Sequence, residues 1–139
     1  MDNVNSYAFE RLEVFSKSRN LVVSIYKMTG TFPTSEQFGL QSQIRRAAVS
    51  IVLNIAEGSS RFSNKEKIRF FEVAYGSAIE VLAAGLLCKD LSYFSEEQEL
   101  EVRSQVSDIT KMLSGLKNRY FDNSNRANDA DPPLYIIDS

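Results

Sequence analysis

The chain has 139 residues, of which 43% are apolar and 24% charged, and its 16 basic and 18 acidic side chains leave a formal charge of −2. This length and balance predict one soluble globular domain and exclude a disordered, collagenous or disulfide-stapled chain. With no histidine and a single cysteine, Cys88, the sequence offers neither an internal disulfide nor a zinc cluster of thiolates.

The first residues, Met1 to Tyr7, contain neither the basic nor the apolar segment of a secretory signal. The longest apolar run, Val81 to Cys88, is much shorter than the ~20 residues that a membrane-spanning helix needs. We therefore expect a cytoplasmic protein that has no membrane partner.

The first predicted helix runs from Phe9 to about Met28, where apolar residues recur at three- and four-residue steps, and Gly30 is its expected stop. Each later helix starts with a capping box, in which Ser or Thr precedes Glu or Gln by three positions. These boxes are Thr34 to Gln37, Ser63 to Glu66 and Ser95 to Gln98. The corresponding helices are expected to end at about Glu57 (with Gly58 as the stop), Leu91 and Tyr120.

Four helices joined by short loops predict an all-α fold, an antiparallel up-down-up-down four-helix bundle, over residues 1–121. Residues 122–139 are polar and aperiodic and are predicted to form a flexible C-terminal tail. The apolar cluster Leu134 to Ile137 within this tail is either a disordered end or a short segment that docks on a neighbour.

The second predicted helix is apolar on two sides when its residues are placed at ~100° intervals. One face holds Leu40, Ile44, Ala47, Ala48, Ile51 and Ile55, and much of the opposite side holds Phe38, Val49, Val52, Leu53 and Ala56. The second face packs either on a neighbouring helix of the same bundle or against another subunit.

A narrow polar stripe separates these two faces and consists of Glu36, Gln43, Arg46, Ser50, Asn54 and Glu57. The stripe is either solvated or a buried network in which Arg46 pairs with Glu57 or Glu80, because a buried unpaired charge is too costly. The candidate oligomer interface or buried polar network therefore comprises Arg46, Val49, Ser50, Leu53, Asn54 and Glu57.

The third predicted helix has one apolar stripe that we expect in the bundle core: Ile68, Phe71, Tyr75, Ile79, Leu82 and Leu86. It is also rich in small residues, among them Ala74, Ala78 and Gly85, which predict close approach to its neighbours.

Charge is unevenly distributed along the chain. Between Arg45 and Arg69 six basic residues stand against two acidic ones, a local charge of +4, although the sequence pI is 5.2. The candidate nucleic-acid-binding residues are Arg45, Arg61, Lys65, Lys67 and Arg69. A solvated loop and helix start is the alternative, since the sequence presents no groove-reading motif or aromatic stacking platform beside these cations.

One family resemblance is carried by the second helix, Phe38-Gly39-Leu40-Gln41-Ser42-Gln43-Ile44-Arg45-Arg46-Ala47-Ala48-Val49-Ser50-Ile51, followed by Asn54-Ile55-Ala56-Glu57-Gly58. It resembles the four-helix-bundle family encoded by intervening sequences of bacterial 23S ribosomal RNA genes. Phe32-Pro33, Phe70-Phe71 and Ala74 to Glu80 extend the similarity, which spans about Phe9 to Tyr120.

The resemblance implies a helical bundle that forms a homopentameric barrel, in a family without a settled biochemical activity. The chain is more distantly similar to the accessory variability determinant of diversity-generating retroelements. That protein looks like a pentamer that binds a reverse transcriptase and nucleic acid, and no individual binding residue is carried over from it.

No enzyme is predicted, because the groups that catalysis needs are missing from the sequence. Glu57 and Glu80 lack the histidines of a Glu-x-x-His metal site, Cys88 lies in an apolar segment typical of an inert core thiol, and no phosphate-binding glycine loop occurs. We therefore expect no catalytic residue, cofactor or metal.

Two functions remain open from the sequence. The first is a non-enzymatic homo-oligomer that binds RNA, DNA or a nucleic-acid-handling protein through the basic residues. The alternative is a structural or adaptor module that binds another protein without nucleic acid.

Overall fold

The computed structural model describes residues 5–128 of the chain, and the side chains of residues 5–122. Its main helices are α1 (Glu13–Thr29), α2 (Leu40–Ser60), α3 (Asn64–Asp90) and α4 (Glu96–Asn128). Two short 3-10 turns, η1 (Ala8–Arg11) and η2 (Thr34–Glu36), precede α1 and α2. Residues 5–128 contain no strand, so the predicted all-α class is confirmed.

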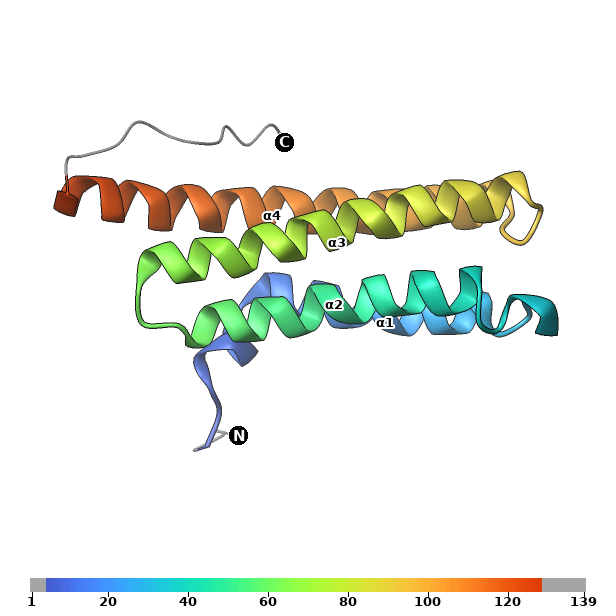
Figure 1. Ribbon diagram of the computed structural model, residues 1–139, viewed down its shortest axis with the longest axis horizontal. Helices are drawn as coiled ribbons and strands as arrows, with labels where there is room; N and C mark the ends of the chain where they lie inside the picture. The colour runs from blue at the N-terminus through green and yellow to red at the C-terminus, as the bar shows by residue number, and fades with distance from the viewer. Residues whose placement is uncertain (1–4, 129–139) are drawn as a thin grey trace.

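The four helices form two layers, with α1 and α2 in one and α3 and α4 in the other (Figure 1). Each helix packs on two others, and the most extensive contacts are those of α3 with α2 and with α4. Short loops make consecutive helices antiparallel, which confirms the predicted up-down-up-down bundle. The α2–α3 turn therefore lies at one end of the bundle, and the α1–α2 and α3–α4 loops lie at the other.

The core is built from apolar side chains on the inward face of every helix. Its largest fully buried apolar members are Leu21, Ile25, Ile44, Ile51, Ile55, Phe71, Val81, Val102, Val106, Ile109 and Leu113. The predicted inward face of α2 is thus confirmed at Ile44, Ile51 and Ile55.

The three capping boxes have different outcomes. At α4 the box is complete, because the Ser95 N–H donates to Gln98 Oε1 at 2.9 Å and the Gln98 N–H donates to Ser95 Oγ at 3.1 Å. At α3 the hydroxyl of Ser63 accepts from the Glu66 N–H at 3.1 Å, while the Glu66 carboxylate turns to Arg69. The first turn of α4 also carries Glu96, Glu97 and Glu99, which the positive end of the helix dipole favours.

The box at Thr34 does not start α2, which begins only at Leu40, so this predicted start is wrong. The segment makes the turn η2 instead, and Glu36 Oε1 accepts the Leu40 N–H at 3.0 Å. Gly39 makes this contact possible, because a Cβ there would lie 2.7 Å from Glu36 Oε1. The Tyr93 hydroxyl donates to the other Glu36 carboxylate oxygen at 3.1 Å, which joins the two loops at this end.

Gly58 is not the stop of α2, because the helix continues to Ser60. It is a buried close-packing position: a Cβ there would lie 2.9 Å from a ring carbon of Phe71 and 3.0 Å from Phe70 Cβ. The helix predicted to start at Phe9 begins at Glu13, after η1.

At the other end of the chain, α4 continues to Asn128, past its predicted end at Tyr120. Residues 122–128 are therefore helical rather than part of a tail. The cluster Leu134 to Ile137 lies outside the described residues.

The inward face of α3 differs from the predicted stripe. Phe71 and Ile68 are buried as expected, but Ile79 is 44% and Leu86 37% exposed. The buried face is instead filled by Ala74, Ala78, Val81, Ala84, Gly85 and Cys88. Small side chains let α3 approach α2 and α4 closely, so the larger apolar residues point outward.

The outward side of α3 is consequently an apolar strip, the α3 strip, that consists of Val73, Gly76, Ile79, Ala83, Leu86 and Leu87. By length and composition alone α3 could also cross a membrane, a property that it shares with core helices of water-soluble bundles.

Candidate functional site

The turn between α2 and α3 is short and places an aromatic ring at the end of the bundle. Arg61 ends α2 through a backbone N–H bond to the Gly58 carbonyl at 3.2 Å, and Ser63 caps α3. Phe62 stands between them with a fully exposed side chain, at 103% relative exposure. Its ring contacts no other aromatic ring and no cation among the described residues.

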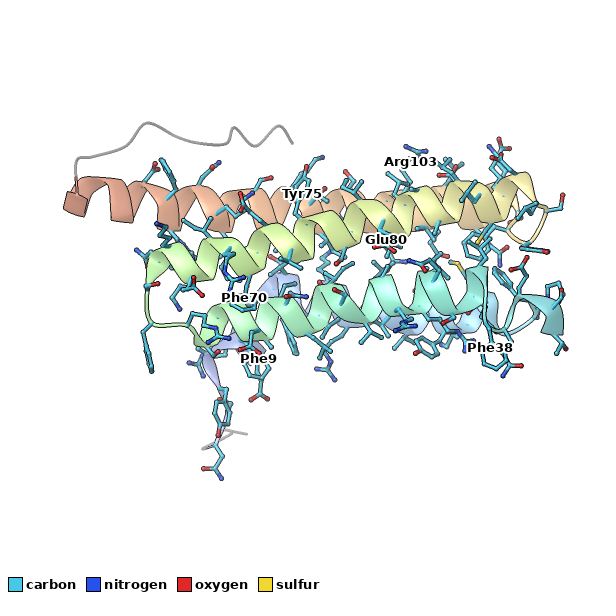
Figure 2. All side chains as sticks on the ribbon, viewed as in Figure 1. Phe9, Phe38, Phe70, Tyr75, Glu80 and Arg103 are labelled. Carbon is cyan, nitrogen blue, oxygen red and sulfur yellow. The ribbon has the colours of Figure 1, made fainter. Side chains whose placement is uncertain are left out.

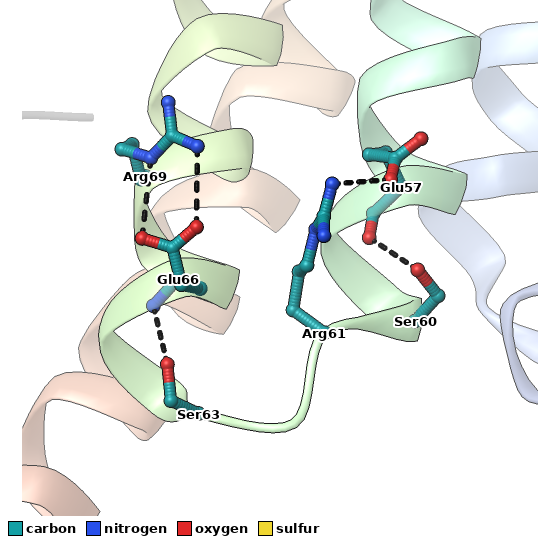
Figure 3. Close-up of polar contacts among 6 residues, drawn as sticks. All are labelled: Glu57, Ser60, Arg61, Ser63, Glu66 and Arg69. Carbon is teal, nitrogen blue, oxygen red and sulfur yellow. Dashed lines mark hydrogen bonds and ion pairs between the residues drawn. The ribbon is translucent and has the colours of Figure 1, made fainter.

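Two of the predicted cations at this turn are neutralised by carboxylates (Figure 3). Arg61 Nη2 lies 2.6 Å from Glu57 Oε2, and Arg69 Nη2 lies 3.1 Å from Glu66 Oε1. The hydrogen bond from Arg69, followed by the positive charges of Arg69, Arg61 and Lys65, lowers the pKa of the Glu66 carboxyl. Glu66 therefore stays ionised and offsets the charge of Arg69 at neutral pH.

Aromatic rings hold most of the cations at this end in place. Phe70 contacts two guanidiniums, with the Arg61 and Arg69 carbons Cζ each 4.6 Å from its ring centre. Lys67 Nζ lies 5.6 Å and Arg119 Cζ 5.4 Å from the ring centre of Tyr120.

The two lysines of the turn differ in their contacts. Lys67 donates to the Ser59 carbonyl at 2.9 Å, so its position is fixed. Lys65 is exposed and makes no hydrogen bond, ion pair or ring contact within residues 5–122. Lys65 acts on Glu66 through its charge alone, so it has no hydrogen bond or ion pair to give up before it binds an external anion.

Arg45 lies far from the other predicted cations. It stands sixteen positions before Arg61 on α2, which is about 24 Å along a helix axis. Its guanidinium donates to Thr29 Oγ1 at 2.8 Å and lies 4.4 Å from the ring centre of Tyr26, which ties α2 to the end of α1. The structure thus brings together Arg61, Lys65, Lys67 and Arg69, but not Arg45.

A second candidate surface is the groove between α1 and α2, which has a volume of about 230 Å³. Its lining is almost wholly apolar: Val22, Val23, Val49, Val52 and Leu53, with Arg19 at its edge. Val23 is 53% and Leu53 61% exposed, so these side chains are not covered by the bundle itself. An adjoining hollow adds Tyr26, Arg46, Ser50 and Asn54.

The polar stripe of α2 is divided between partners on its own helix and on α3. Ser50 and Ser77 hydroxyls lie 2.8 Å apart, and Asn54 Nδ2 donates to the Ser50 carbonyl at 2.8 Å. Gln43 donates to Glu80, whereas Glu57 is bound by Arg61.

The pairing of Arg46 with Glu57 or Glu80 is one of the two alternatives that the sequence leaves open, and it does not occur within the described residues, where Glu57 is bound by Arg61 and Glu80 by Gln43. Arg46 is exposed and forms no hydrogen bond or ion pair with the described side chains. In the single chain Arg46 is therefore solvated. A role for it in a subunit interface stays a prediction.

Cys88 is buried at 0% exposure, and burial, with the nearby charge of Glu36, raises the pKa of its thiol to about 12. Such a thiol is protonated and unreactive at neutral pH. Residues 5–122 contain no group of three or more Cys, Asp or Glu side chains placed to hold a metal ion.

Phe62 and Phe70 belong to the site but are not among the residues predicted from the sequence. The sequence contains one local sign that Phe62 is exposed. It stands between Arg61 and the capping residue Ser63, in a turn that has no repeating apolar pattern and therefore no predicted buried face.

Comparisons with known proteins place the chain in a family. Residues 10–115 match the family described as 23S rRNA-intervening sequence protein. A crystal structure of a protein with unknown function, from the S23 ribosomal protein family of Bacteroides thetaiotaomicron, is similar with a TM-score of 0.68 and 26% identity. The similarity covers 75% of this chain and 97% of that one. A search of curated proteins gave no match. The chain belongs to the 23S rRNA-intervening sequence protein family.

Proposed function

We propose that this chain is a non-enzymatic helical module that assembles with copies of itself and binds nucleic acid at its α2–α3 turn. The observation that carries the assembly is the uncovered apolar groove between α1 and α2. The observation that favours nucleic acid is that an exposed aromatic ring, Phe62, and an exposed cation without a hydrogen bond or ion pair within residues 5–122, Lys65, lie three residues apart at one turn.

A second copy of the chain is the occupant that best fits the groove. Burial of apolar surface is the main favourable contribution to most protein association, and the α3 strip offers an apolar counterpart on the other layer of the bundle. The charges are complementary as well, since Arg19 and Arg46 border the groove while Glu80 and Asp90 lie beside the strip.

A contact between two different surfaces is heterologous, and it closes into a ring when the rotation between copies permits. The homopentameric barrel that the family resemblance implies is a ring of this kind. The groove and the α3 strip would then both be buried in every subunit.

The test of assembly is the native mass measured by light scattering. We expect the wild-type mass to be a multiple of 15.7 kDa and the Leu53→Asp variant to shift toward the single-chain mass. Leu100→Asp is the matched control, because Leu100 is 54% exposed on α4, outside the groove. If Leu53→Asp keeps the wild-type mass, the groove is not the interface; a monomeric wild type would leave it free for another protein.

The test of nucleic-acid binding is fluorescence anisotropy of labelled RNA and DNA at low and physiological salt. We expect saturable binding that salt weakens, because each phosphate contact releases bound counterions. Lys65→Ala should weaken the binding and reduce its salt dependence, whereas Lys111→Ala, which removes an exposed charge from α4, should change neither. Absence of binding at low salt would contradict this part of the proposal.

A further inference from the structure

We infer that the α2–α3 turn binds single-stranded nucleic acid, with an unpaired base stacked on the ring of Phe62 and an adjacent phosphate held by Lys65. The inference rests on the nucleic-acid part of the proposed function and specifies its ligand. Four observations at the turn carry it.

The first observation is the exposure of Phe62. A phenylalanine at 103% relative exposure has gained nothing from folding, and the ring projects from a turn instead of lying along a helix face. Both faces of the ring are therefore open to a planar ligand. Nucleic-acid bases are such ligands, and stacking on an aromatic side chain is tolerant of base identity.

The second observation is the contrast with the neighbouring rings. Phe70 already has the guanidiniums of Arg61 and Arg69 at 4.6 Å from its ring centre, and Tyr120 has Lys67 and Arg119 within 6 Å of its own. These rings position cations, and only Phe62 among the three has a ring free of such contacts in the described part of the chain.

The third observation is the position of the cations relative to Phe62. Arg61 immediately precedes the ring and is fixed by Glu57 and Phe70, while Lys65 follows it on the first turn of α3 without a partner. A strand whose base stacks on Phe62 therefore meets, beside its backbone, one lysine without a hydrogen bond or ion pair to the described residues and one arginine bound to Glu57. This is the combination of ring and cation by which proteins bind single strands.

The fourth observation is the modest charge, which disfavours a duplex. Arg61, Lys65, Lys67 and Arg69 are opposed by Glu57 and Glu66, so the turn has a net charge of +2. Duplex binders neutralise many phosphates or insert an element into a groove, and this turn offers one ring and one free cation. In a duplex both faces of each internal base are already stacked, so Phe62 would gain no contact there.

The experiment compares a labelled oligouridylate strand with an RNA duplex of equal length, using anisotropy at low salt. We expect the strand to bind more tightly than the duplex. Phe62→Ala should lower the affinity for the strand by about 5- to 150-fold, the range expected for loss of one stacked base, whereas Phe62→Tyr should retain it.

The matched control is Phe38→Ala, which removes a ring of 90% exposure at the opposite end of α2 and should leave the affinity unchanged (Figure 2). A strand that carries the fluorescent base analogue 2-aminopurine gives a second readout, because stacking on Phe62 should quench it in the wild type but not in Phe62→Ala.

Other outcomes separate the two proposals. Failure of both strand and duplex to bind would overturn the nucleic-acid function and this inference together. Binding that depends on Lys65 but not on Phe62, or binding that prefers the duplex, would keep nucleic acid as the ligand and overturn the stacking site. A change of native mass in Phe62→Ala would assign the ring to a subunit contact and also overturn it.

Discussion

Single residues in this bundle have roles that their chemistry alone does not disclose. Arg45 lies on α2 and Arg61 directly follows its last residue, yet Arg45 ties α1 to α2 through Thr29 and Arg61 binds Glu57 beside the α2–α3 turn. Both arginines contribute to the local charge of +4 that is counted along the sequence. The rise of the helix nevertheless keeps them about 24 Å apart. Sequence proximity along a helix is therefore a poor guide to a shared binding site.

Cys88 is the residue whose titration bears on stability. The folded thiol has a pKa of about 12 against an ordinary value of 9.0, so between these pH values the folded state retains a proton that the unfolded state loses. We expect the free energy of unfolding to fall as pH rises from 9 toward 12. The native thiol should also react with a disulfide reagent only as fast as the chain opens.

The comparison for this prediction is Cys88→Ala, followed by urea unfolding across the same pH range. The loss of the thiol leaves a cavity that lowers the free energy of unfolding at every pH. The decrease of that free energy with pH that the thiol causes should, however, vanish. An identical slope in both proteins, or rapid labelling of the native thiol at neutral pH, would contradict the expectation.

At the scale of the helices, spacing predicts which segments are helical better than it predicts which side faces inward. The prediction is correct for Ile44, Ile51 and Ile55, which are buried on one side of α2 together with the smaller Ala47 and Ala48. On α3 the same spacing predicts that Ile79 and Leu86 face inward, but both are exposed. Ala74, Ala78 and Ala84 fill the narrow space beside α2 and α4 instead. Apolar periodicity alone does not predict that close packing between helices can favour small side chains on the buried face.

Gly58 offers a test of that close packing between α2 and α3. In Gly58→Ala the new Cβ would lie 2.9 Å from a carbon of the buried Phe71 ring, so the two helices must shift. We expect overpacking of about 1–3 kcal/mol to exceed the gain of about 1 kcal/mol in helix propensity, and the variant to be less stable. The urea midpoint measures this difference.

Gly115→Ala, on α4 and outside both the groove and the α3 strip, is the matched control for Gly58→Ala. A Cβ at Gly115 meets no atom within 4 Å, so only the helix propensity changes, and the variant should gain up to about 1 kcal/mol. Equal effects of the two substitutions would mean that α2 and α3 are not closely packed at Gly58.

At the scale of the whole molecule, two separate apolar surfaces make the assembly test more specific. In a heterologous contact, Leu53→Asp blocks the groove but leaves the α3 strip, and Ile79→Asp blocks the strip but leaves the groove. Each variant alone should have a reduced native mass, and an equal mixture should form a two-chain species through the one intact pair of surfaces. A two-fold contact between identical surfaces would give no such recovery.

The antiparallel arrangement has one more consequence, which concerns the approach to a ligand. The α2–α3 turn with Lys65 and Lys67 lies at one end of the bundle, and the acidic first turn of α4, with Glu96 and Glu97, lies at the other. The two ends of the described bundle thus differ in local charge despite the small net charge. If nucleic acid is the ligand, as proposed above, this difference favours an approach in which the turn with Phe62 faces the polyanion.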